Sequence, residues 1–108
     1  MALSYKFISS PSTATRKMLT RRMLVGRVLS AAEDEEIINS ASWGAVLLIQ
    51  GMMTEMYGAV DVGTKTSPVL AMEVFGNCPQ HVVTMAFIGN VADVKQVLSA
   101  LKSEGLVA

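Results

Sequence analysis

The chain has 108 residues and a formal net charge of zero, and its residues are 51% hydrophobic and 17% charged. This length suits one compact domain, and the neutral charge gives no overall electrostatic reason to bind nucleic acid or acidic lipid. The longest unbroken apolar run, residues 45–49 (AVLLI), is far shorter than the roughly 20 residues that cross a bilayer, so we expect no membrane span. So small a domain leaves apolar surface uncovered, which favours a subunit interface.

The N-terminal 32 residues are basic and contain no acid; their positive residues are Lys6, Arg16, Lys17, Arg21, Arg22 and Arg27. Together with many serines and threonines, this composition is typical of a mitochondrial transit peptide. We favour a structured alternative in which residues 18–25 form a strand, because the later segments lack one strand of a complete sheet. Residues 1–15 are then an N-terminal extension that could be loosely ordered, and residues 16–108 form the domain.

The next segment is predicted to be a short helix over residues 31–40. Ser30 and Glu33 form an S-x-x-E capping box, and further acids lie in the first turn, where the helix dipole favours negative charge. A strand is predicted over residues 44–51, because this short apolar run is bounded by glycines.

A second helix is predicted over residues 53–65, followed by a stop signal at Pro68. Its apolar residues fall at helical spacing: Met53, Met56, Tyr57 and Val60. Residues 69–75 and 81–88 are predicted to be two strands of a hairpin with the turn GNCPQ at residues 76–80.

The last predicted element is a helix that begins after Asn90, a suitable N-terminal cap, and ends at Gly105. One face of this helix is apolar and consists of Val91, Val94, Leu98 and Leu101. The predicted order is thus β-α-β-α-β-β-α. This order describes an α+β fold with a four-stranded antiparallel sheet, a ferredoxin-like sandwich that is circularly permuted so that its last strand comes first.

The segment 44–101 resembles the shell domain of bacterial microcompartments. Its first helix ends in D-x-x-x-K, from Asp61 to Lys65, and its last helix opens with GNVADV, residues 89–94, which matches G-[DN]-V-x-x-V. The strand and helix before Gly44 resemble the permuted single-domain class of these proteins. This resemblance implies a structural, non-enzymatic role in the shell, in the bacterial cytoplasm, as a homohexamer that contacts other shell proteins. It also implies that Lys65, with Asp61 beside it, lies at the hexamer edge.

Within that class, the G-x-C-P-Q turn resembles the U-type shell proteins of glycyl-radical propanediol microcompartments. The resemblance implies an iron-sulfur cluster of the four-iron type, one per hexamer and labile, in the central pore. The residues of the turn would surround it: Gly76, Asn77, Cys78, Pro79 and Gln80.

The chemistry of Cys78 agrees with a site that several chains share. A cluster needs about four thiolates and the chain has one cysteine, which also excludes an intramolecular disulfide and indicates a reducing setting. Pro79 would stiffen the loop, and the amides around Asn77 could donate hydrogen bonds to sulfur. The alternative for a lone cysteine is a small buried hydrophobic residue, although a polar turn is an unusual place for one.

Other polar residues have simpler alternatives. His81 is a second candidate ligand, or an imidazole at a strand edge that hydrogen bonds satisfy. Asp61 and Lys65 could form only a surface ion pair at i and i+4.

Catalysis finds little support, because no acid stands near His81 to orient it toward Cys78. The alternative function is a small ferredoxin-like regulatory or ligand-sensing oligomer without a cluster, since the fold alone does not separate these classes.

Overall fold

The computed structural model describes residues 2–25, 31–76 and 82–107. Its elements follow in chain order: β1 (Ser4–Ser9), α1 (Thr13–Val25), α2 (Ala31–Ser40), β2 (Ala45–Met52), α3 (Met53–Thr66), β3 (Leu70–Glu73), β4 (Val82–Gly89) and α4 (Val91–Ser103). The four strands form one antiparallel sheet in the order β1-β2-β4-β3. The predicted permuted α+β fold with a four-stranded antiparallel sheet is therefore confirmed. None of the described helices is long and apolar enough to span a membrane.

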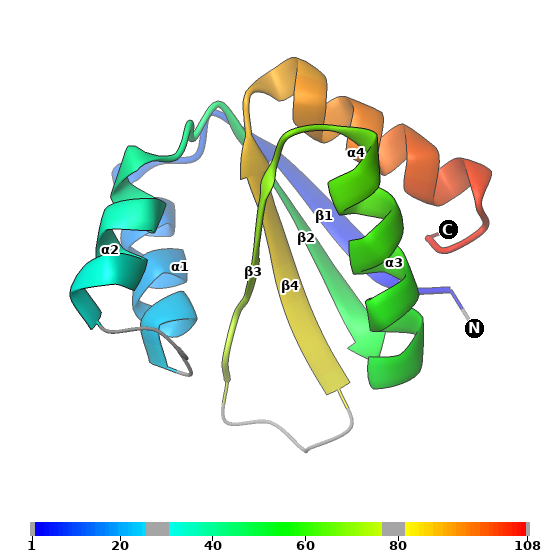
Figure 1. Ribbon diagram of the computed structural model, residues 1–108, viewed down its shortest axis with the longest axis horizontal. Helices are drawn as coiled ribbons and strands as arrows, with labels where there is room; N and C mark the ends of the chain where they lie inside the picture. The colour runs from blue at the N-terminus through cyan, green and yellow to red at the C-terminus, as the bar shows by residue number, and fades with distance from the viewer. Residues whose placement is uncertain (1, 26–30, 77–81, 108) are drawn as a thin grey trace.

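Helices cover both faces of the sheet, with α1 and α2 on one side and α3 and α4 on the other (Figure 1). The alternation of side chains along β2 explains this layering, because successive residues of a strand point to opposite faces. Leu47 and Ile49 belong to the core under α3 and α4, whereas Val46 lies in a second core with Leu19 and Met23 of α1. A sheet with two buried faces accounts for the high apolar content of so short a chain.

The strand predicted at residues 18–25 is wrong, because these residues form the second half of helix α1. Leu19 and Met23, at i and i+4, are buried against the sheet, while Met18 is 70% exposed. That pattern is a helical stripe and differs from strand alternation. Ser12 precedes the helix and its hydroxyl accepts a hydrogen bond from the Thr15 amide at 3.2 Å, which is N-terminal capping that the sequence analysis overlooked.

The fourth strand of the sheet is instead β1, which lies inside residues 1–15, the segment that we placed outside the domain as an N-terminal extension. Its six residues pair with β2 from Ser4 opposite Gln50 to Ser9 opposite Ala45. Leu3, just before the strand, is buried in the core and its amide donates to the Leu106 carbonyl at 2.8 Å. This N-terminal segment is therefore part of the folded unit.

The remaining elements lie where they were predicted, within a few residues at their ends. The helix at 31–40 is α2, and the helix after Asn90 is α4, in which the Asn90 side chain accepts a hydrogen bond from the Asp93 amide at 2.8 Å. β3 is shorter than predicted and ends at Glu73. The predicted capping residue Ser30 and the turn residues 77–80 lie outside the described residues.

Two glycines of α3 give a matched pair of stability tests. A Cβ at the buried Gly63 would lie 2.7 Å from Cε1 of Phe87 and 3.1 Å from Cγ1 of Val97, whereas a Cβ at Gly58 would meet nothing within 4 Å. Phe87 is fully buried, so its ring has little room to move. Gly63→Ala should therefore lower the free energy of unfolding by about 1–3 kcal/mol through overpacking.

The control is Gly58→Ala, which should raise the free energy of unfolding by up to about 1 kcal/mol, because alanine is the better helix former. Urea denaturation of both variants measures the two changes. Equal midpoints for the two variants would contradict the close packing of α3 on Phe87.

Candidate functional site

The candidate site lies at the end of the sheet where β3 leads to β4. The strands are antiparallel and Glu73 pairs with Met85, so the end of β3 and the start of β4 lie at the same end of the sheet. Their pairing continues past β3, because the Val74 amide donates to the Thr84 carbonyl at 2.8 Å. We call this region the hairpin end.

Most of the predicted cluster-binding residues lie outside the described residues, in the segment 77–81 between these strands. They are Asn77, Cys78, Pro79 and Gln80, together with the second candidate His81. Gly76 is the one predicted residue of the turn that the structure describes. Gly76 is exposed, and a Cβ built on it would meet nothing within 4 Å. A side chain at this position would therefore have room.

The structure adds contacts at the hairpin end that the sequence analysis missed. The Phe75 amide donates to the Arg22 carbonyl at 3.2 Å, so the last turn of α1 holds the chain just before Gly76. On β2 and β4, the Gln50 side-chain amide donates to the Thr84 hydroxyl at 2.9 Å. Both contacts join segments far apart in the chain, and no local sequence motif signals them.

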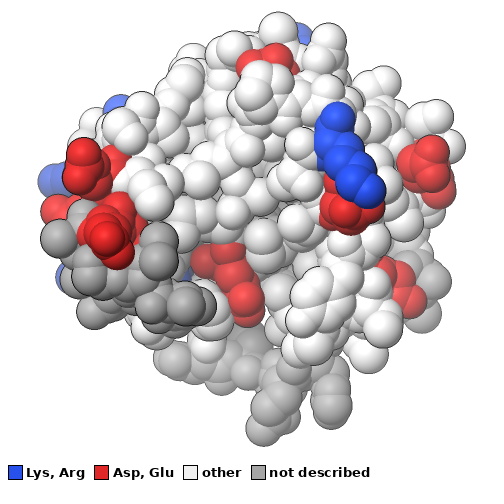
Figure 2. Space-filling model, viewed as in Figure 1, with Lys and Arg blue, Asp and Glu red and all other residues white. Residues whose placement is uncertain are grey.

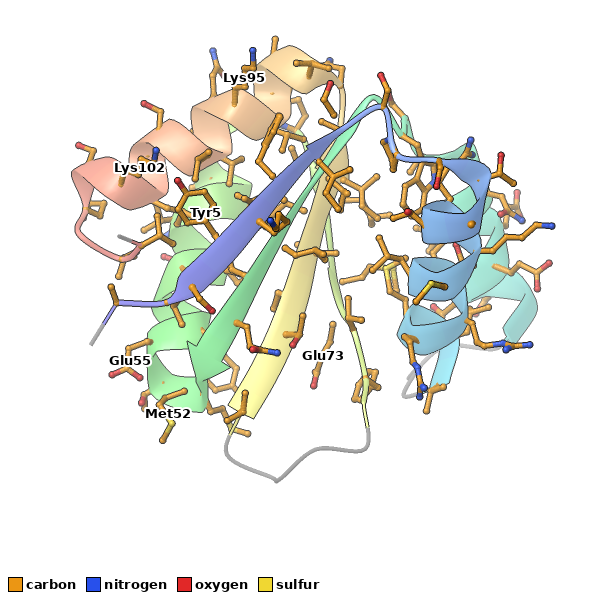
Figure 3. The ribbon with its side chains drawn as sticks, turned by 180° about the vertical axis from the view of Figure 1, so that it is seen from behind. Tyr5, Met52, Glu55, Glu73, Lys95 and Lys102 are labelled. Carbon is orange, nitrogen blue, oxygen red and sulfur yellow. The ribbon has the colours of Figure 1, made fainter. Side chains whose placement is uncertain are left out.

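Exposed apolar side chains also gather near the hairpin end. Met52 pairs with Val82 across β2 and β4, and the two are 50% and 43% exposed. The next residues along the chain begin α3, where Met53 is 44% and Tyr57 is 70% exposed. Figure 3 shows Met52 at the foot of β2 beside the start of α3. We call these four residues the apolar foot, and such a patch suits contact with another protein surface.

The described part of one chain offers no metal site of its own. The chain's one cysteine and one histidine lie outside the described residues, and among the described aspartates and glutamates no group of three or more could hold a metal ion. Cys78 is the chain's one thiol. The donor set of this protein therefore fits a metal cluster only if several copies contribute a thiolate each.

Asp61 and Lys65 lie on α3 and form an ion pair of 2.9 Å between Oδ2 and Nζ. Their side chains are 62% and 74% exposed, so the pair contributes only a few tenths of a kcal/mol to the helix. Lys65 is in the last turn of α3, at the end of the sheet opposite the hairpin end (Figure 1). An edge contact through Lys65 and a pore contact through the hairpin end would thus use opposite ends of the molecule.

No protein-family model matches this chain, and no curated protein matches it significantly. Solved structures do match. The ligand-free GrpU microcompartment shell protein from Pectobacterium wasabiae has a TM-score of 0.62 and 26% identity, over 91% of this chain and 98% of the other. The ligand-free GrpU shell protein from Clostridiales bacterium 1_7_47FAA has a TM-score of 0.63 and 25% identity, over 94% and 89%.

A third solved structure shares the fold at lower identity. It is the fused permuted hexameric shell protein MSM0275 from the RMM microcompartment, with a TM-score of 0.63 and 19% identity over 97% of this chain and 46% of the other. The fold and the similarity together define a microcompartment shell protein with a permuted shell domain. The two GrpU matches support a shell protein of this type and confirm the resemblance found in the sequence.

Proposed function

We propose that the chain is the subunit of a cyclic homohexamer that tiles the shell of a bacterial microcompartment in the bacterial cytoplasm, and that Cys78 residues from several subunits bind one iron-sulfur cluster in the central pore. The observation that carries the proposal is the match to GrpU shell proteins, which extends over nine-tenths of the chain. The role is structural, and the partners are further copies of the chain and other shell proteins.

The hexamer is supported by the apolar foot and by the fold. Four exposed apolar side chains at one end of a small domain favour burial in an interface. A ring of identical subunits can bury them without a second protein. One protein of the same fold is described as hexameric. If the hairpin ends converge on the ring axis, every copy brings its thiol to one shared space.

The proposed cluster is supported by the number of thiols that a ring of subunits would supply and by the preference of such clusters for thiolate ligands. An iron-sulfur cluster takes about four thiolates, and a ring whose subunits carry one thiol each supplies more than enough. When bound, such a cluster can accept or donate an electron. Cys78 would ligate iron, Pro79 would stiffen the backbone, and Gly76, Asn77 and Gln80 would complete the loop around the sulfurs. Four ligands cannot follow a sixfold axis, so the bound cluster would break the ring symmetry.

The assembly itself is tested by multi-angle light scattering of the purified protein at micromolar concentration. We expect a single species with the mass of a hexamer, because the apolar foot is covered only in the ring. A monomer or a trimer as the dominant species would contradict the proposal.

The edge role of Lys65 is tested by Lys65→Ala, with Asp61→Asn as the matched control on the same helix. We expect both variants to remain hexamers, and Lys65→Ala to reduce the two-dimensional sheets seen by electron microscopy, because its ammonium group would contact the neighbouring hexamer. The loss of the exposed ion pair alone, which Asp61→Asn reproduces, should cost only a few tenths of a kcal/mol in stability. Dissociation of the Lys65→Ala hexamer would place the residue in a different interface.

A further inference from the structure

The two helices on one side of the sheet carry opposite charges. α1 has four basic residues and no acid, and α2 has four acidic residues and no base. α2 lies in front of α1 in Figure 1, and α1 lies in front of α2 in Figure 3, which is drawn from behind. The two helices therefore lie side by side, each nearer to a different side of the molecule. Lys17, Arg21 and Glu35 line one hollow between the two helices, so part of their charge meets within the chain. Beyond this hollow, α1 presents positive charge on its side of the pair and α2 presents negative charge on the other.

The outer surface of α1 forms a basic face around an exposed methionine. Lys17, Met18, Arg21 and Arg22 line a hollow on this surface, and the Met18 side chain is 70% exposed. Lys17 and Arg21 are neighbours at i and i+4, so their like charges destabilise the helix by a few tenths of a kcal/mol. Within the described parts of the chain, no ion pair offsets this repulsion, since the pair found there joins Lys65 and Asp61.

The outer surface of α2 forms an acidic face of similar design. Glu35 and Glu36 line a hollow there with Asn39 and Ser40, and the neighbouring Ile37 is 41% exposed. Figure 2 shows acidic side chains gathered over this part of the molecule, and further acidic side chains elsewhere on the same face. Each face thus combines charges of one sign with one exposed apolar side chain.

We infer that the basic face of one subunit docks on the acidic face of the next subunit in the ring. This inference rests on the proposed hexamer and identifies one of its contacts. A contact between two different surfaces of the same chain is head-to-tail, which is the kind that closes into a ring. Met18 and Ile37 lie at the centre of the contact, and opposite charges surround them. The partner is a second copy of the chain, because each chain carries both a basic and an acidic face. In a closed ring, every basic face then meets an acidic face of the neighbouring subunit.

The test uses two charge-reversed variants and their mixture. Arg21→Glu with Arg22→Glu makes both faces acidic, and Glu35→Lys with Glu36→Lys makes both faces basic. Each variant alone should assemble at least about tenfold more weakly in light scattering, because like charges would meet across the contact. An equal mixture of the two should restore the hexamer, since alternating subunits place an acidic face against a basic one everywhere.

Two controls separate this contact from a general effect of charge or folding. Lys95→Glu with Lys102→Glu, on α4, has the same change in net charge as the α1 variant and should leave the hexamer intact. Circular dichroism should show every variant folded. The mixture leaves the charges within each chain unchanged, so its recovery can come only from contacts between chains.

The outcomes distinguish this inference from the proposed function. If the wild-type protein is a hexamer and both reversed variants are too, the docking of the two faces is overturned and the shell function stands. Loss of the hexamer in both variants without recovery in the mixture also overturns the docking, because the two faces then do not meet each other. A wild-type protein that is not a hexamer overturns both.

Discussion

Replacing Cys78 by serine should abolish the visible absorption of the anaerobically purified protein while its fold and its hexamer remain. The chain has no other thiol, and thiolates are the ligands that hold iron-sulfur clusters. The described residues hold their fold through two hydrophobic cores on opposite faces of the sheet and through strand pairing. We therefore expect the fold to persist without the thiol. The absorption spectrum and the iron content give the first result, and light scattering gives the second.

The matched control is His81→Gln, which alters the neighbouring candidate ligand and keeps the thiol. It should retain the absorption, because thiolates suffice for the cluster. Full retention of iron in Cys78→Ser would contradict a shared cluster on this residue. Loss of the hexamer in the same variant would mean that Cys78 has a structural role instead.

Removing residues 1–9 should abolish cooperative unfolding. This deletion takes away β1, which pairs with β2 along its whole length, and also Leu3, which is buried in the larger core. β2 would become an unprotected edge, and the core under α3 and α4 would lose one wall. We expect no cooperative transition in thermal or urea denaturation.

A milder version of this test replaces Leu3 by alanine. The change should lower the free energy of unfolding by about 2–5 kcal/mol, which is a large part of the 5–15 kcal/mol typical of a domain. Met18→Ala is the control and should change stability by less than about 0.5 kcal/mol, because this side chain is 70% exposed. A truncated protein with the wild-type midpoint would show that the first residues are a dispensable extension.

The sequence predicts most of this fold because its clearest periodic segments are also its buried ones. β2 is a short apolar run between glycines, and α4 combines a capping residue with an apolar stripe, so both were located correctly. β1 was missed because only half of its short sequence, SYKFIS, is apolar, and because it lies at the sheet edge, where one row of hydrogen bonds suffices. α1 was taken for a strand because its apolar residues cluster, although the spacing of Leu19 and Met23 is helical.

The candidate site was only partly predictable for a different reason. Cys78 stands out in the sequence because it is unique and lies in a turn. The apolar foot does not stand out, since Met52 and Val82 become neighbours only through the register of β2 and β4. The opposition of charge between α1 and α2 likewise depends on how the two helices pack side by side on the sheet, which composition alone does not determine.

The central claim is a hexamer whose subunits share one cluster through Cys78. Native mass spectrometry of the anaerobically purified protein tests it most directly, because one spectrum reports both the number of chains and the mass of bound iron and sulfide. We expect a hexamer that carries about four irons in total, as one shared four-iron cluster requires. A hexamer with one cluster on every chain, or iron bound to a single free chain, would contradict the claim.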